Sequence, residues 1–136
     1  MLVAPIRLAL GVLWLAAARL AGAGSTPALL AFATGAVGFL FLAFNDPRSA
    51  FLTRAEPQPV PAGATVAGPL RQALQATLPS TAGVSVLAAI AVVPVPVLAA
   101  FLGGISAGIG VGGLAAAPRI DPALLVDPRT GAVYRS

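Results

Sequence analysis

The chain contains no cysteine, no histidine and no lysine, and only four of its 136 residues are acidic. No disulfide can form, thiolate ligands are missing, and the usual histidine-based zinc and iron sites cannot be built. General acid–base and nucleophilic catalysis depend on positioned His, Cys, Lys or paired carboxylates. The composition therefore predicts a protein that is not an enzyme and that has no catalytic, cofactor-binding or metal-binding residues.

Charge is scarce as well, since 9% of the residues are charged, 58% are hydrophobic and the mean hydropathy is +0.95. Soluble domains carry about 25% charged residues. All eight basic residues are arginines, and they are scattered singly instead of forming the basic patches that bind nucleic acid. The sequence therefore indicates an all-α integral membrane protein whose partner is the lipid bilayer, with no nucleic-acid partner. The heavy use of Ala, Gly, Val, Pro and Arg without lysine indicates a GC-rich bacterial genome, so the membrane is expected to be a bacterial inner membrane.

Two apolar runs near the N-terminus are each about as long as a bilayer is thick. The first covers residues 2–23 and the second covers 27–44, with a short uncharged stretch between them. About 20 apolar residues cross the hydrocarbon core as a helix, so these runs predict a hairpin of two transmembrane helices. The alternative for the first run is a secretory signal with Ala21–Ala23 as its small-residue cleavage site, although Arg19 interrupts that region.

Residues 45–80 have a different composition, with six prolines and most of the polar residues of the chain. We expect this stretch to be an extramembrane connector. Within it, residues 69–78 place leucine and alanine on one helical face and Arg71, Gln72 and Gln75 on the other, which is typical of a short helix on the membrane interface. The alternative is a solvated helical turn that contacts nothing.

Residues 81–117 contain no charge, and as one helix they would be about 55 Å long, nearly twice the thickness of the hydrocarbon core. Arginines flank this block on both sides, and positively charged loops favour the cytoplasmic side of a membrane. The block is therefore expected to cross twice. We place the turn near Gly103 and Gly104, which predicts spans at 81–101 and 104–117.

Pro94 and Pro96 interrupt the third of these spans. Each proline removes a backbone donor and frees a carbonyl in the preceding turn, which hydrocarbon cannot satisfy. The third helix is therefore predicted to be kinked at this site. The alternative is a full break of the helix at the prolines. The segment before the break would then have only about 13 residues, so it would be re-entrant instead of crossing the bilayer.

Together these features predict one membrane domain, residues 1–136, folded as a small polytopic bundle of about four transmembrane helices in two hairpins, the third Pro-kinked and the fourth Gly-rich. Four crossings leave both termini in the cytoplasm, so the predicted location is the plasma membrane, with several passes. The tail, residues 118–136, either forms a hairpin turned at Pro128–Gly131 or is frayed.

The clearest motif is the run GGISAGIGVGG, in which Gly104, Gly108 and Gly112 repeat every four residues and share one helical face. Small residues let helix backbones approach closely in lipid, where the hydrophobic effect does not drive helix association. This glycine zipper therefore predicts a helix-packing face, whose partner is a helix of the same chain or of a second subunit. The alternative is that the glycines only make the segment flexible.

The few charged residues in or beside the spans have structural interpretations. Arg19 lies near the end of the first span, where its long side chain is expected to reach the aqueous boundary; the alternative is a functional anion contact or interhelical partner. Three Asp-Pro pairs begin at Asp46, Asp121 and Asp127. Aspartate favours the N-cap and proline the position after it, so we interpret these pairs as turn signals.

Three functions are compatible with these features. The glycine-lined face and the lack of site chemistry favour a structural, assembly or accessory subunit, in a homo-oligomer or with other membrane subunits. The alternative is a small transporter or channel for a neutral or anionic solute, in which the helix break at Pro94 and Pro96 exposes backbone groups for binding. A pore former of few spans is the third.

Overall fold

The computed structural model describes residues 3–45, 58–60, 69–116, 124–126 and 133–135. Within these ranges the chain is mostly helical, with four α-helices and a small three-stranded sheet. The elements in chain order are α1 (Val3–Leu20), α2 (Ser25–Phe44), β1 (Gln58–Pro59), α4 (Pro69–Ala91), α5 (Pro96–Ala116), β2 (Leu124–Val126) and β3 (Val133–Arg135).

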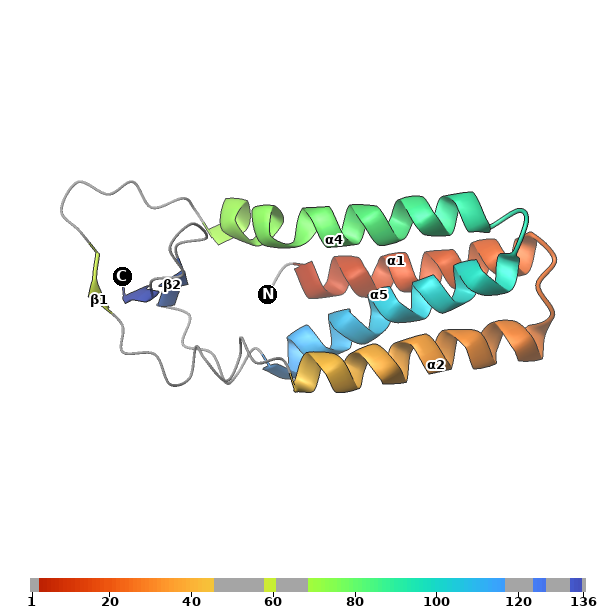
Figure 1. Ribbon diagram of the computed structural model, residues 1–136, viewed down its shortest axis with the longest axis horizontal. Helices are drawn as coiled ribbons and strands as arrows, with labels where there is room; N and C mark the ends of the chain where they lie inside the picture. Colours follow the sequence, from red (N-terminus) through yellow and green to blue (C-terminus); the bar gives the residue numbers. More distant parts are fainter. Residues whose placement is uncertain (1–2, 46–57, 61–68, 117–123, 127–132, 136) are drawn as a thin grey trace.

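The helices form a bundle of two antiparallel hairpins (Figure 1). The α1–α2 and α4–α5 connections lie at one end of the bundle, and the start of α1, the end of α2, the start of α4 and the end of α5 lie at the other. The sheet lies beyond that second end. Helix α5 packs against all three other helices and most extensively against α1 and α2, which contact each other little. The central helix of the bundle is therefore α5.

Three of the helices, α1, α2 and α5, are long and apolar enough to cross a membrane. The shortest of them, α1, has 18 residues. A helix of that length rises about 27 Å, close to the ~30 Å hydrocarbon core. Helix α4 is different, because its apolar part is limited to Leu78–Ala91, which rises only about 21 Å. The sequence predicts about four spanning helices, and three of the described helices have the length and composition to span a membrane.

A glycine cap ends α1 and satisfies its last carbonyl groups. Gly22 has a φ of +98°, a left-handed conformation that side chains disfavour. The Gly22 amide donates to the Arg19 carbonyl (3.1 Å) and the Ala23 amide donates to the Ala18 carbonyl (3.0 Å), which are the paired bonds of a Schellman motif. Because Ala18 and Ala23 are both buried, the same residues that cap α1 also pack the start of the turn into α2.

The connection between α4 and α5 lies elsewhere than the sequence predicts. Gly103 and Gly104, the expected turn, are inside α5, and the chain turns at 92–95 instead. The two prolines determine this position. Pro94 lies in the turn, and Pro96 is the first residue of α5, where the missing N–H would have no helical partner in any case. The expected spans 81–101 and 104–117, and the expected kink within a third helix, are therefore corrected to α4, a turn and α5. The chain breaks at the two prolines, which is the alternative to a kink that the sequence left open.

The backbone of Val95 joins the two helices across this turn. Its amide donates to the Ala91 carbonyl at the end of α4 (2.9 Å), and its carbonyl accepts a bond from the Leu98 amide in the first turn of α5 (2.9 Å). One residue thus serves as the last donor of one helix and the first acceptor of the next. The short turn therefore leaves few backbone N–H and C=O groups without a hydrogen bond.

The predicted interfacial helix 69–78 is not a separate element. It is the first part of α4, which runs for 23 residues from Pro69 to Ala91 with Pro79 inside it, so the predicted connector 45–80 is shortened by the length of this helix. Proline removes one helical hydrogen bond. The helix nevertheless continues through Pro79, and α4 as a whole packs on α5 and α1.

Two short strands of the tail pair with each other, as the predicted hairpin requires. Strands β2 and β3 pair antiparallel, with Leu125 opposite Tyr134 and Val126 opposite Val133. The predicted turn at Pro128–Gly131 lies outside the described residues. Strand β1 pairs in parallel with β3, so the strand order is β1-β3-β2. The all-α prediction omitted this sheet because strands of two and three residues are too short to show a periodic pattern.

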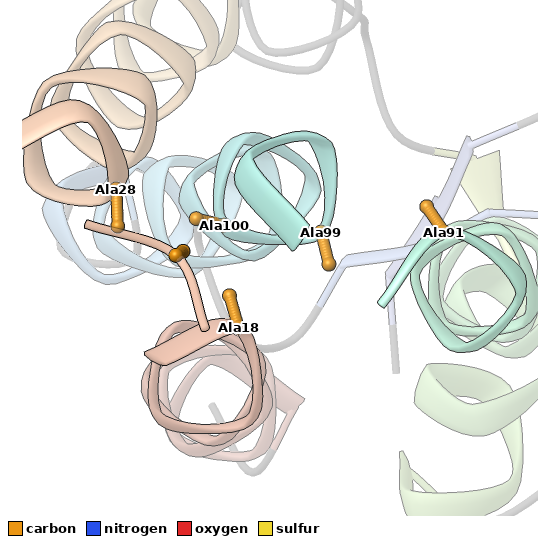
Figure 2. Packing of buried hydrophobic residues seen from close by; sticks show 6 residues of the cluster. Ala18, Ala28, Ala91, Ala99 and Ala100 are labelled. Atoms are coloured by element: carbon orange, nitrogen blue, oxygen red, sulfur yellow. The ribbon is translucent and has the colours of Figure 1, made fainter. Parts of the chain in front are cut away.

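The core of the bundle is built from small side chains. Its buried cluster consists of alanines: Ala18, Ala23, Ala28, Ala91, Ala99 and Ala100. Figure 2 shows Ala18, Ala28 and Ala100 converging from α1, α2 and α5. Within the described ranges no large side chain is fully buried, whereas Phe41 is 69% exposed and Leu20 is 91% exposed. This arrangement is the reverse of that in soluble proteins, whose interiors hold most of the large apolar side chains.

Candidate functional site

The first candidate site is the face of α5 that carries Gly104 and Gly108, and it packs against α2. A Cβ placed on Gly104 would overlap the carbonyl oxygen of Phe32. One placed on Gly108 would overlap the carbonyl oxygen of Ala36. The contact is reciprocal, because a Cβ on Gly35 of α2 would overlap a carbonyl oxygen of α5. Backbone therefore packs directly on backbone here, which requires residues without a side chain.

A second face of α5, which the glycine spacing did not predict, packs against α1. A Cβ on Gly103 would lie 2.8 Å from the Gly11 carbonyl oxygen, and a Cβ on Gly11 would lie 2.6 Å from that of Gly103. Further along, a Cβ on Gly110 would lie 2.9 Å from the Ala4 carbonyl oxygen. Gly103, Ala107 and Gly110 recur at spacings of four and three, which keeps them on one helical face. A search for glycine at every fourth position overlooks such a face because alanine stands in its middle.

These two faces place α5 between α1 and α2. Gly112, the third residue of the predicted glycine face, is also buried. The sequence left open whether the packing partner belongs to the same chain. In the structure, α2 of the same chain covers Gly104 and Gly108. The close approaches of α5 thus hold the bundle together from its centre.

A polar cluster, formed by Arg7, Ser80 and Thr81, joins α1 to α4. Arg7 donates a hydrogen bond from Nε to Thr81 Oγ1 and another from Nη2 to Ser80 Oγ, both at 3.0 Å. The stem of Arg7 packs near α5, since a Cβ on Gly110 would lie 3.3 Å from Arg7 Cβ. This cluster was not predicted from the sequence. Its only sequence signal is a pair of hydroxyl residues near the start of the apolar part of α4, together with an arginine near the start of an apolar helix.

The other predicted site residues lie at the opposite end of the bundle. Arg19 is exposed in the last turn of α1, and its guanidinium has no hydrogen-bond partner in the described part of the chain. Its reach to the aqueous boundary stays a prediction. Pro94 and Pro96 lie at the α4–α5 connection, so they do not open backbone groups in the middle of a helix.

Two interior polar atoms, Trp14 Nε1 on α1 and Ser85 Oγ on α4, have no hydrogen-bond partner among the described residues. Leaving a buried donor or acceptor unsatisfied costs about 1–3 kcal/mol. Trp14 also contacts the second glycine face, because a Cβ on Gly103 would lie 3.0 Å from Trp14 Cβ. The burial of these two polar groups therefore lowers the stability of the bundle.

The described ranges contain no group of three or more His, Cys, Asp or Glu residues that could hold a metal ion. All four acidic residues of the chain lie outside those ranges. No protein-family model, curated protein or solved structure matches this chain.

Proposed function

We propose that this chain is an integral protein of the plasma membrane, with several passes and both termini in the cytoplasm, and that it acts as a structural, assembly or accessory subunit of a homo-oligomer or a larger membrane complex. The observation that carries this proposal is the distribution of side-chain size, with alanine and glycine inside the bundle and large apolar residues outside.

The energy of this arrangement supports lipid as the solvent. Among the described residues, 18 large apolar side chains are at least 40% exposed. Burying one such side chain fully contributes about 1.5–3 kcal/mol in water, so leaving all of them about half exposed forgoes on the order of 20 kcal/mol. That exceeds the stability of a typical soluble domain, about 5–15 kcal/mol. In lipid the same side chains lose nothing by facing outward, and small residues become the natural packing surface.

The distribution of arginine supports the proposed orientation. Six of the eight arginines lie between the end of α2 and the first turn of α4, or after the end of α5, and these are the helix ends opposite the two turns. Short loops rich in arginine favour the cytoplasmic side of a membrane. The end of the bundle where α1 begins and α5 finishes therefore faces the cytoplasm, and the two turns face outward.

The role of a subunit rests on the outer surface of the bundle and on the residues available, because the glycine faces are used within the chain. Both close-packing faces of α5 are covered by α1 and α2 of the same chain, so a partner would contact the outer surface of large aliphatic side chains. The sequence has no His, Cys or Lys from which a nucleophile and its base could be built.

The alternative function, transport of a neutral or anionic solute, depends on a helix broken inside the membrane at Pro94 and Pro96. Because both prolines belong to a connection at the end of the bundle, this break does not favour the alternative (Figure 1). The structural or accessory role is therefore the one we propose.

Membrane fractionation followed by gentle solubilisation tests the proposal. The chain is expected to stay in the membrane pellet after an alkaline carbonate wash. After extraction in mild detergent, native mass spectrometry is expected to find it as a homo-oligomer or together with a co-purifying membrane subunit. Release by carbonate would contradict membrane insertion. An inserted chain that is always a lone monomer would contradict the role of a subunit.

A further inference from the structure

We propose that Arg7, held in place by Ser80 and Thr81, binds the phosphate group of an anionic membrane lipid at the end of the bundle where α1 begins. This inference rests on the proposed membrane location and adds a ligand of defined chemistry to it.

The positive charge of Arg7 has no negatively charged partner among the described residues. A guanidinium has five N–H donors, and Arg7 directs two of its N–H groups to hydroxyl oxygens at 3.0 Å. Hydroxyl groups accept these bonds but carry no negative charge, and all acidic residues of the chain lie outside the described ranges. The described contacts therefore leave the positive charge uncompensated and three N–H groups available for an anionic acceptor.

The second step is that Arg7 is already positioned. Its stem lies beside Gly110 of α5, and its guanidinium is bonded to α4 through Ser80 and Thr81. A side chain that is ordered before binding loses little conformational freedom when a ligand arrives. The cluster also opens to the outside of the bundle, because Ser80 and its hydrogen bond with Arg7 are exposed and Arg7 itself is only partly buried.

The third step is the depth of the cluster. In α4 the apolar part begins at Leu78, so Ser80 and Thr81 lie within one turn of its polar end. In α1, Arg7 follows the first helical residue, Val3, by a rise of about 6 Å. In the proposed orientation this end faces the cytoplasmic leaflet, whose anionic lipids attract basic residues near the surface. Phosphate oxygens accept the forked N–H bonds of arginine, which makes a lipid phosphate the matching acceptor.

Native mass spectrometry of the detergent-purified chain tests this inference, with equal amounts of phosphatidylglycerol and phosphatidylcholine added. Both lipids carry a phosphodiester, but only phosphatidylglycerol has a net negative charge. The wild-type chain is expected to retain phosphatidylglycerol about fivefold over phosphatidylcholine, which corresponds to the ~1 kcal/mol of one arginine at an anionic surface. Arg7→Gln is expected to lose this preference. Arg7→Lys is expected to keep part of it, because the charge remains while the planar fork is lost.

Matched variants keep the result interpretable. Arg19→Gln removes an arginine from the other end of the same helix and is expected to keep the full preference for phosphatidylglycerol. Thr81→Val keeps the shape of the side chain, removes the acceptor for Arg7 Nε and is expected to weaken the preference without loss of folding. If Arg7→Gln does not fold, Thr81→Val becomes the deciding variant. An unchanged preference of Thr81→Val for phosphatidylglycerol would then overturn the inference.

Two outcomes separate the possible sources of failure. Inorganic phosphate at millimolar concentration is expected to leave the thermal unfolding temperature unchanged, and a rise equal to that produced by phosphatidylglycerol would overturn the assignment to a lipid. An equal lipid preference in the wild type and Arg7→Gln, with both chains resisting carbonate extraction, would overturn this inference and leave the membrane proposal intact. Extraction of the wild type by carbonate would instead contradict the proposed function itself.

Discussion

Glycine decides how closely the helices approach at single positions, and Gly104 shows this most directly. In Gly104→Ala the added methyl group would meet the carbonyl oxygen of Phe32. The substitution is expected to lower the free energy of unfolding of the bundle by about 1–3 kcal/mol, the usual cost of overpacking. Thermal unfolding in detergent micelles, followed by circular dichroism, measures the loss.

Gly38→Ala on α2 is the control for this prediction. Nothing lies within 4 Å of a Cβ built at Gly38, which is exposed. Alanine there is expected to leave stability unchanged or to raise it by up to about 1 kcal/mol, because alanine is the better helix former. If Gly104→Ala and Gly38→Ala had the same effect, the close packing of α5 on α2 would be refuted.

The two serines of α4 are expected to respond in opposite directions to the loss of a hydroxyl. Ser85 Oγ has no partner in the described part of the chain, so Ser85→Ala removes an unsatisfied polar group. It is expected to raise the free energy of unfolding by about 1 kcal/mol. Ser80 accepts a bond from Arg7 Nη2, so Ser80→Ala is expected to lower it. The same unfolding measurement compares them, and a loss in both variants would show that the Ser85 hydroxyl is bonded.

Residue spacing identifies some of these positions and not others. Gly104, Gly108 and Gly112 share a helical face by their four-residue spacing, so the sequence alone reveals them. It does not reveal the bonds of Arg7, because its two partners are 73 and 74 residues away along the chain. No local pattern relates positions so far apart, and only the packing of α1 beside α4 brings them together.

At the scale of the secondary-structure element, apolar length predicts the first hairpin closely. The expected runs 2–23 and 27–44 differ by three residues or fewer at each end from α1 and α2. The second hairpin is displaced because two signals compete within one uncharged block. Glycine pairs indicated a turn in the middle of the block, but prolines stop a helix more strongly than glycines do. In lipid, moreover, glycine serves the contact between helices.

The contact between α1 and α5 is close enough to be trapped by a disulfide. A Cβ on Gly113 would lie 3.8 Å from Ala4 Cβ, and disulfides join Cβ atoms about 3.8 Å apart on average. The chain has no cysteine of its own. Ala4→Cys/Gly113→Cys is therefore expected to form an intramolecular disulfide on mild oxidation, detected by peptide mapping of the unreduced chain.

A second pair of cysteines provides the control for this crosslink. Ala4→Cys/Gly38→Cys moves one thiol to α2, at a position where a Cβ has no neighbour within 4 Å. This pair is expected to stay reduced under the same conditions. Equal crosslinking of both pairs, or none in the first, would show that α1 does not lie along α5 as described.

For the molecule as a whole, composition predicts the solvent and the fold class, while the arrangement of the helices requires the structure. Scarce charge and long apolar runs indicate a helical membrane protein, and three helices have the length and composition for it. The central place of α5 does not follow from hydropathy, because α2 is almost as apolar. It follows from two glycine-lined faces on one helix, which let α5 approach α1 and α2 at once. Among the described glycines, those of α2 show a close approach to α5 alone.

The arrangement of the four described helices, with both turns at one end of the bundle, makes a prediction about sidedness. Val93, in the α4–α5 connection, is 80% exposed, and this connection lies at the end of the bundle away from the start of α1 and the end of α5 (Figure 1). In spheroplasts, a membrane-impermeant maleimide is expected to label Val93→Cys from outside, because in the proposed orientation the arginine-rich end faces the cytoplasm. A cysteine appended after Ser136 is expected to react only after permeabilisation, and the cysteine-free wild type is expected not to react at all. Labelling of both cysteines from the same side would mean that α5 does not cross the bilayer. The proposed sidedness, with both hairpins crossing, would then be wrong, because α5 is the helix that connects the two labelled positions.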